Sequence, residues 1–194
     1  MNLKRVCVYC ASSTKIPAVY MESASELGKI FAMHNITTIY GGGSVGSMGA
    51  LADSVLENKG KIVGVIPEFM MNLEWGNPLI TELIVVESMN ERKMKLIENV
   101  DAVVALPGGT GTLEELTEVI SMKKLGLFTK PIVIINTLNF YYPLFELFDR
   151  MIKDCFIRNE HSKIYSIVKH PQEVIEAIHN APTWTKTALN LAAM

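Results

Sequence analysis

Short runs of apolar, mostly β-branched residues recur along the chain and alternate with segments of helical periodicity. Their near-continuous apolar character is typical of strands buried on both faces of a parallel sheet, and the alternation predicts an α/β fold. We expect a Rossmann-like three-layer fold, with a mostly parallel central sheet of about six or seven strands and helices on both faces. The expected strands are 6–9, 37–40, 61–66, 83–86, 102–106, 131–135 and, as a possible seventh, 164–168; the clearest helical patterns are 17–34, 113–125 and 173–178.

The length of 194 residues predicts one domain, which we place over residues 1–180, followed by a C-terminal tail over 181–194. The formal net charge of −2 lacks the basic excess that attracts nucleic-acid polymers or membrane surfaces. Three cysteines are too few for a disulfide framework, and no apolar run approaches the ~20 residues that span a bilayer. The N-terminus enters a strand-like run without the features of a signal peptide. We therefore expect a cytoplasmic protein with neither a membrane nor a nucleic-acid polymer as its partner.

A first glycine cluster, Tyr40-Gly41-Gly42-Gly43-Ser44-Val45-Gly46, follows the second expected strand. It meets the formal Gly-x-Gly-x-x-Gly pattern, with Glu68 following 22 residues after Gly46, but it does not follow the first strand of the fold. Three interpretations stay open: a turn that lets backbone approach a ligand, a nicotinamide-binding fingerprint, and a tight strand-to-helix turn without any ligand.

A second glycine cluster, Pro107-Gly108-Gly109-Thr110-Gly111-Thr112, joins the fifth expected strand to a helix. The amides of Gly109 to Thr112 and the two threonine hydroxyls can act as donors to a phosphate. No Lys-Ser/Thr pair follows the last glycine, so this is not a triphosphate-binding P-loop. Glu114 and Glu115 follow directly, and an alternative explanation for them is compensation of the helix dipole in the first turn.

A third motif, Met89-Asn90-Glu91-Arg92-Lys93, begins a helix after the fourth expected strand. Because all three motifs follow strand ends in a parallel sheet, we expect them at one edge of the sheet, where such folds bind ligands. A cation there would meet an anionic ligand or an acid such as Glu115.

Together these motifs resemble the signature of the Lonely Guy family, the cytokinin riboside 5′-monophosphate phosphoribohydrolases, whose members were long mislabelled as lysine decarboxylases. The resemblance rests on Pro107-Gly108-Gly109-x-Gly111-Thr112-x-x-Glu115, on Met89-x-x-Arg92-Lys93, on the first glycine cluster and on Cys10-Ala11-Ser12-Ser13. It extends from about residue 3 to about residue 180. Ala11 and Ser47 depart from the usual glycine and leucine, but neither change removes a chemical group.

The resemblance implies hydrolysis of the N-glycosidic bond of AMP or an N6-modified adenosine 5′-monophosphate, without a metal or other cofactor. It also implies a homodimer or higher homo-oligomer, whose pocket is completed by the neighbouring subunit. The family's essential pair corresponds to Arg92 and Glu115, which we expect to be catalytic. The residues expected to bind the substrate are Ser12, Gly42, Gly43, Glu74, Met89, Lys93, Gly108, Gly109, Thr110, Gly111, Thr112, Glu114 and Ser121.

Two rival functions remain on the sequence alone: a non-catalytic nucleotide-binding or sensing module of the same fold, and a nicotinamide-dependent dehydrogenase. Cys7 and Cys10 are expected on opposite faces of one strand, and the four histidines, which lie outside the motifs, in surface or capping positions. Phe140-Tyr141-Tyr142 is expected to pack on a helix or on another subunit.

Overall fold

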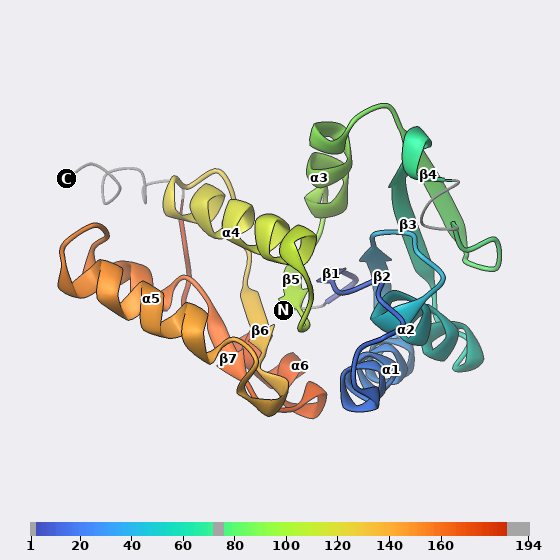
Figure 1. The fold of residues 1–194 in the computed structure, drawn as a ribbon, viewed down its shortest axis with the longest axis horizontal. Coiled ribbons are helices and arrows are strands. Elements are labelled where there is room, and N and C mark those ends of the chain that lie inside the picture. The colour runs from blue at the N-terminus through green and yellow to red at the C-terminus, as the bar shows by residue number, and fades with distance from the viewer. Residues whose placement is uncertain (1–2, 72–75, 186–194) are drawn as a thin grey trace.

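The computed structural model describes residues 3–71 and 76–185, which form a single seven-stranded sheet with helices on both sides (Figure 1). Every strand pair is parallel, and the strand order is β4-β3-β2-β1-β5-β6-β7. The expected fold class is therefore confirmed. The strands are β1 Arg5–Tyr9, β2 Thr37–Tyr40, β3 Ile62–Pro67, β4 Glu82–Val86, β5 Ala102–Ala105, β6 Ile132–Ile135 and β7 Ser166–Val168.

Six α-helices occur in the described part of the chain, of which five connect strands and α6 follows β7. They are α1 Ala18–Met33, α2 Gly46–Glu57, α3 Met89–Ile97, α4 Thr110–Lys124, α5 Tyr142–Lys153 and α6 Val174–Asn180; short 3₁₀ turns cover η1 Glu68–Met70, η2 Thr137–Asn139, η3 Asn159–Lys163 and η4 Pro171–Glu173. None of the described helices is long and apolar enough to cross a bilayer. Helix α5 was not predicted; it begins at Tyr142, the last residue of the aromatic segment Phe140-Tyr141-Tyr142.

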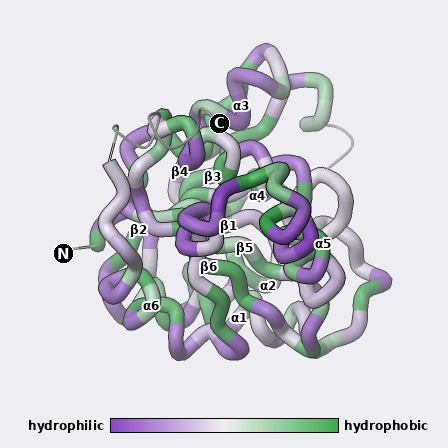
Figure 2. Tube along the Cα trace, turned by 90° about the vertical axis from the view of Figure 1, so that its left-hand side faces the viewer, coloured by the Kyte–Doolittle hydropathy of each residue, from purple (hydrophilic) through white to green (hydrophobic). Residues whose placement is uncertain are grey.

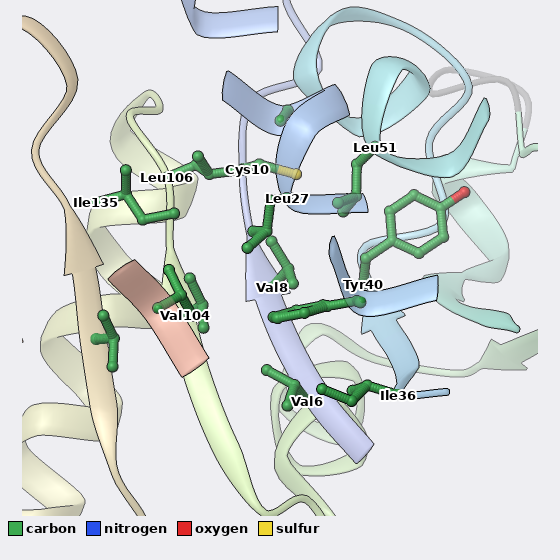
Figure 3. Close-up of a cluster of buried hydrophobic side chains, with 14 of the residues drawn as sticks. Val6, Val8, Cys10, Leu27, Ile36, Tyr40, Leu51, Val104, Leu106 and Ile135 are labelled. Carbon is green, nitrogen blue, oxygen red and sulfur yellow. The ribbon is translucent and has the colours of Figure 1, made fainter. Parts of the chain in front are cut away.

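The sheet separates two apolar cores, because successive side chains of each strand point to opposite faces. Val6 and Val8 of β1 join the core beneath α1, α2 and α6, whereas Cys7 and Tyr9 join the core beneath α3, α4 and α5. Figure 3 shows part of the first core, where Leu27 of α1 lies close to the central strands and is fully buried. Hydrophobic stretches accordingly lie in the middle of the molecule in Figure 2.

The order in which strands are added to the sheet reverses its direction at β1, and this reversal creates a crevice at the carboxyl edge of the sheet. The chain adds β2, β3 and β4 on one side of β1, and β5, β6 and β7 on the other. The loops that leave the carboxyl ends of β1 and β5 therefore diverge and open a crevice between them, which is the usual ligand position in open α/β sheets. Both the Cys10–Ser13 segment and the second glycine cluster leave the sheet at this point.

The described beginning of the expected C-terminal tail packs against the second core. The Trp184 ring lies 5.9 Å from Lys123 Nζ, and its Nε1 donates a hydrogen bond to the Lys123 carbonyl. Trp184 therefore lies against α4.

Candidate active site

A cavity of about 260 Å³ lies in the crevice between β1 and β5, at the carboxyl edge of the sheet. It collects side chains and backbone from four separate parts of the chain. Its lining residues are Cys10, Ala11, Ser12, Ser13, Met48, Arg92, Gly109, Thr110, Gly111, Thr112 and Glu115. Both residues expected to be catalytic and five of those expected to bind the substrate are thus brought together.

Arg92 is fixed in this cavity by the ends of two strands. Helix α3 begins at a defined point, because the Ser88 hydroxyl accepts from the Glu91 amide and caps the first turn. Arg92 follows in that helix with only 4% of its surface exposed. Its Nε donates to the Val65 carbonyl at 3.1 Å and its Nη2 to the Gly41 carbonyl at 3.1 Å. The guanidinium is therefore held rigidly, as a directed cation requires.

The first glycine cluster makes room for other side chains around the cavity. A Cβ on Gly41 would lie 2.5 Å from Arg92 Nη2, and one on Gly43 would lie 2.8 Å from Met48 Sδ. Gly46 has a φ of +63°, and a Cβ there would lie 2.5 Å from the Ser13 carbonyl oxygen. Gly42 and Gly43, expected to bind the substrate, are not among the cavity's lining residues. The close approaches that these glycines permit are to Arg92, Met48 and the Ser13 loop.

Glu115 faces the same cavity from α4 and is 8% exposed. Its charge and that of Arg92 both act on Cys10. Burial raises the pKa of the Cys10 thiol well above its usual range, Glu115 raises that pKa further, and Arg92 lowers it. Cys10 is therefore an uncharged part of the cavity wall, which it shares with two residue types of opposite charge, Glu115 and Arg92.

The second glycine cluster supplies an open helix N-terminus. Gly109 is the N-cap residue of α4, and no acid lies in the first turn. Gly108 is required by packing, because a Cβ there would lie 2.2 Å from Thr112 Oγ1. A Cβ on Gly109 or Gly111 would meet no atom within 4 Å, so both face open space. Unpaired amides at such a terminus favour an anion.

This start of α4 also decides the alternative explanation of the two glutamates. The helix begins at Thr110, which leaves both Glu114 and Glu115 beyond its first turn. Compensation of the helix dipole, which is confined to that turn, therefore does not account for them.

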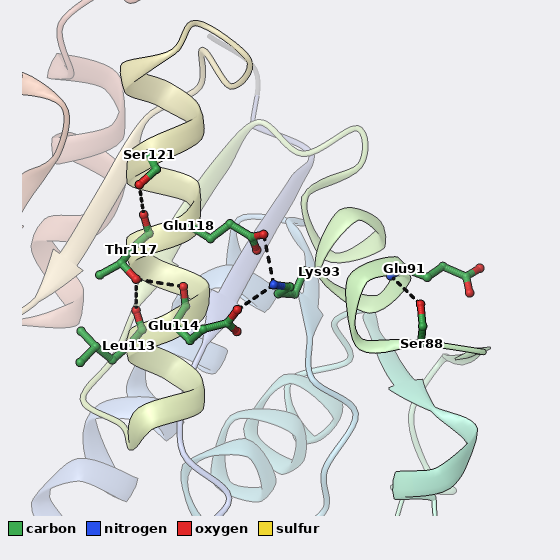
Figure 4. A network of polar contacts seen from close by, with 8 residues as sticks. All are labelled: Ser88, Glu91, Lys93, Leu113, Glu114, Thr117, Glu118 and Ser121. Atoms are coloured by element: carbon green, nitrogen blue, oxygen red, sulfur yellow. Dashed lines mark hydrogen bonds and ion pairs between the residues drawn. The ribbon is translucent and has the colours of Figure 1, made fainter. Parts of the chain in front are cut away.

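Lys93 joins the two helices that carry Arg92 and Glu115 (Figure 4). Its Nζ lies 2.7 Å from Glu114 Oε1 and 3.1 Å from Glu118 Oε1. These contacts raise the pKa of Lys93. Lys93 and Glu114, both expected to bind the substrate, contact each other and are not among the cavity's lining residues.

The remaining expected residues lie elsewhere. Met89 is the half-buried first residue of α3, and Ser121 donates to the Thr117 carbonyl and lines a different hollow beside α5. Glu74 lies outside the described residues. Cys10, Ala11 and Ser13 carried the family resemblance but were not predicted as site residues, although their position directly after the first strand was a usable signal. Met48, expected to line the base pocket or the core, does line the cavity. No cluster of three potential metal-ligating side chains occurs among residues 3–71 and 76–185.

Comparison with known proteins gives two kinds of similarity. The sequence profile of the family described as "Possible lysine decarboxylase" matches residues 48–178. A probable cytokinin riboside 5′-monophosphate phosphoribohydrolase of Oryza sativa subsp. japonica is 39% identical over 177 residues, covering 91% of this chain and 72% of that protein. A cytokinin riboside 5′-monophosphate phosphoribohydrolase of Arabidopsis thaliana is 33% identical over 191 residues, covering 98% and 89%.

Among solved structures, the molybdenum cofactor binding protein of Rippkaea orientalis superposes with a TM-score of 0.69 at 22% identity, covering 92% of this chain and 97% of that chain. The molybdenum cofactor carrier protein of Chlamydomonas reinhardtii has a TM-score of 0.68 at 20% identity, covering 92% and 98%. At these identities the likeness concerns the fold alone.

Proposed function

The chain belongs to the family of the cytokinin riboside 5′-monophosphate phosphoribohydrolases, and on that premise we propose how its own residues perform such a hydrolysis. It is a glycosidase-type hydrolase that releases a free base and ribose 5-phosphate from a nucleoside 5′-monophosphate. The proposed substrate is AMP or an N6-modified adenosine 5′-monophosphate. One observation carries the proposal: Arg92 and Glu115, both more than nine-tenths buried, line one cavity with the open N-terminus of α4.

Each of these groups has a place in the reaction. Cleavage of the bond between C1′ and the base nitrogen passes through an oxocarbenium-like state, in which the sugar becomes positive. The Glu115 carboxylate stabilises that charge and orients or deprotonates the attacking water, whose oxygen forms the new bond to C1′. The base leaves with the electron pair of the broken bond and takes up a proton.

The anionic parts of the substrate meet the donors of the cavity. The amides of Gly109 to Thr112 hold the 5′-phosphate at the N-terminus of α4. The fixed Arg92 guanidinium offers directed donors that offset charge on the departing base or hold the nucleotide in place. This division uses only side chains and backbone amides of residues that line the cavity, and it requires no metal or other cofactor.

The first glycine cluster favours this function over a nicotinamide-dependent dehydrogenase. Its glycines approach Arg92, Met48 and the Ser13 loop, so they leave no cradle for a dinucleotide pyrophosphate there. A non-catalytic nucleotide-binding module would retain the α4 amides, but it has no use for a buried carboxylate opposite a buried guanidinium.

We further propose that the working unit is a homodimer or higher homo-oligomer in which a second copy covers the cavity rim. Two apolar side chains support this arrangement. Met94 of α3 is 55% exposed and Leu113 of α4 is 38% exposed, and they follow Lys93 and precede Glu114 respectively. Both side chains lie on the two helices that carry Arg92 and Glu115, where a second copy could remove their apolar surface from water.

The function is tested by Glu115→Gln, which removes the charge and keeps the shape. We expect release of free base from AMP, measured by chromatography, to fall by at least about 10³-fold, while the circular dichroism spectrum is unchanged. The matched control is Glu118→Gln, three residues further along α4 and not among the cavity's lining residues, for which activity stays within a few-fold of the wild type. Near-normal hydrolysis by Glu115→Gln, or no hydrolysis of AMP or isopentenyladenosine monophosphate by the wild type, would overturn the assignment.

A further inference from the structure

A second cavity, of about 280 Å³, lies between α4, α5 and η3, and no residue lines both cavities. We call it the α4–α5 cavity. Its wall is mostly apolar and partly aromatic. The apolar side chains that matter here are Ile120, Phe148, Met151, Ile152, Ile164 and Tyr165. This volume lies near the lower end, about 300 Å³, of cavities that hold small molecules, so an occupant would be one ring with a short chain.

One buried polar atom in this wall has no partner. His161 is 4% exposed, and its Nδ1 accepts a hydrogen bond from the Arg158 amide at 3.1 Å. Because Nδ1 accepts, the hydrogen of the neutral ring is on Nε2. His161 Nε2 is buried and has no hydrogen-bond partner in the structure. An unpaired buried donor destabilises the folded protein, so its persistence in a cavity wall calls for an acceptor.

Among the polar groups in the wall, His161 Nε2 and the Lys124 ammonium are available to bind a ligand. Ser121 Oγ already donates to the Thr117 carbonyl, and Ser162 Oγ donates to the Asn159 carbonyl. Lys124, half-buried in the wall, forms no ion pair with any described residue. No acid is among the described residues that line the cavity.

The charges around His161 are also positive on balance. Lys124 of α4 and Arg158, which precedes η3, both lower the pKa of His161, whereas Glu160 raises it. Two cations and one acid thus act on the ring, and burial is the largest cause of its lowered pKa. The surroundings favour an anionic acceptor over a neutral one.

We propose that the α4–α5 cavity binds a small carboxylate with an apolar body. The carboxylate accepts a hydrogen bond from His161 Nε2 and pairs with Lys124, and the body packs against Ile120, Phe148 and Tyr165. The proposal goes beyond the hydrolysis and does not depend on it. It gives the buried donor a partner and the apolar wall an occupant.

The test uses 3-phenylpropanoate as the probe and 3-phenylpropan-1-ol as its uncharged match, with the full chain in isothermal titration calorimetry. We expect saturable sub-millimolar binding of the carboxylate and at least tenfold weaker binding of the alcohol. His161→Phe and Lys124→Met should each weaken the carboxylate at least tenfold, while His170→Phe, at an exposed histidine, leaves it unchanged. Excess AMP should not displace the probe.

Four results would overturn the proposal: no saturable binding to the wild type, equal binding of the alcohol, undiminished binding to a folded His161→Phe, or displacement by AMP. If His161→Phe does not fold, Ile120→Trp fills the cavity and must abolish binding instead. The His161 Nε2 resonance in ¹⁵N-labelled wild-type protein gives a further readout, since it must shift on addition of the carboxylate. An unmoved resonance at saturation would equally contradict the site.

Discussion

At the scale of single residues, the candidate active site buries two charged side chains, Arg92 and Glu115. Removing a charged group from water costs free energy, which an apolar core avoids. Arg92 and Glu115 are charged residue types that are rarely so fully buried. Arg92 satisfies two strand-end carbonyls, and its loss would leave the carbonyls of Val65 and Gly41 without that donor. Its burial therefore has both a structural and a functional consequence.

This dual role of Arg92 predicts that its substitution affects stability more than substitution of Glu115 does. Arg92→Ala should abolish hydrolysis and also lower the free energy of unfolding by about 3–5 kcal/mol, because it leaves buried groups unpaired. Glu115→Gln should abolish hydrolysis with a much smaller stability change. Urea unfolding of both variants measures the difference, and equal stability of the two would show that the strand-end contacts contribute little.

Lys123 is a second buried charge, outside the candidate active site. It is 1% exposed, and burial lowers its pKa from 10.5 to about 8. The unfolded chain therefore holds a proton on this lysine between pH 8 and 10.5 that the folded protein has released. Stability consequently rises with pH across this interval and is lower by a constant amount below it.

Lys123→Met should therefore raise the free energy of unfolding at pH 7 by about 1–3 kcal/mol. The gain should shrink as the pH rises from 8 to 10.5, because the wild-type lysine then also becomes neutral in both states. Denaturant titrations at pH 7 and pH 10 measure both effects, with Lys153→Met on exposed α5 as the control. A gain that is independent of pH would contradict the proposed cause.

Sequence reasoning worked best at residues whose role depends on local spacing. Arg92, Glu115 and the Gly109–Thr112 turn were predicted and share one cavity. It could not assign Gly41, because its neighbour, Arg92, lies 51 residues away in sequence. The burial of His161 was equally inaccessible, because it depends on how α5 and η3 pack on α4.

At the scale of elements, the glycines at the start of α4 have two different roles. Gly108 is required by packing, whereas Gly109 and Gly111 leave open space. Gly109→Ala and Gly111→Ala add a methyl group only to open space, and alanine favours the helix at position 111 by roughly 0.5–1 kcal/mol. Gly108→Ala forces a clash with Thr112, which we expect to cost about 1–3 kcal/mol.

The three variants should therefore divide into two classes. Gly109→Ala and Gly111→Ala should melt at or near the wild-type temperature, but raise the KM for AMP at least tenfold, because the methyl group enters the space of the phosphate. Gly108→Ala should lower the melting temperature. Unchanged KM in the first two variants would mean that the phosphate lies elsewhere.

Helix α5 shows why one element escaped prediction. Two consecutive residues before it, Leu138 and Asn139, have φ values of 52° and 59°. Neither is glycine, so the left-handed turn that reorients the chain leaves little trace in the sequence. The aromatic segment Phe140-Tyr141-Tyr142 was therefore interpreted as a packing patch. Tyr141 does pack inside, where its hydroxyl donates to the Leu106 carbonyl, and Tyr142 begins the helix.

At the scale of the whole molecule, the proposed oligomer makes the cavity dependent on a second copy. Glu substitutions at Met94 and Leu113 place charge on the proposed interface. We expect the wild type to sediment at twice its chain mass of 21.5 kDa or more, and the double variant to sediment as a monomer with at least tenfold lower activity. Met33→Glu, at an exposed apolar residue at the end of α1, serves as the control. A fully active monomeric double variant would exclude a shared site.

The sequence also left the order of the strands open. Apolar runs indicate which segments are strands and that the sheet is parallel, but they carry no information on which strands are neighbours. That order follows from how α1 and α2 cover one face while α3 and α4 cover the other.

The central position of β1 in the sheet has a consequence for folding during synthesis of the chain on the ribosome. Cys7 of β1 pairs with Ile39 on one side and with Val103 on the other. At a translation rate of about 5–20 residues per second, the second partner arrives roughly 3 to 13 s after the first. Throughout that interval the nascent chain presents one unpaired strand edge, a template on which neighbouring nascent chains can pair. The edge of β1 that pairs with β5 beside the crevice in the folded protein is thus exposed to aggregation until β5 has been synthesised.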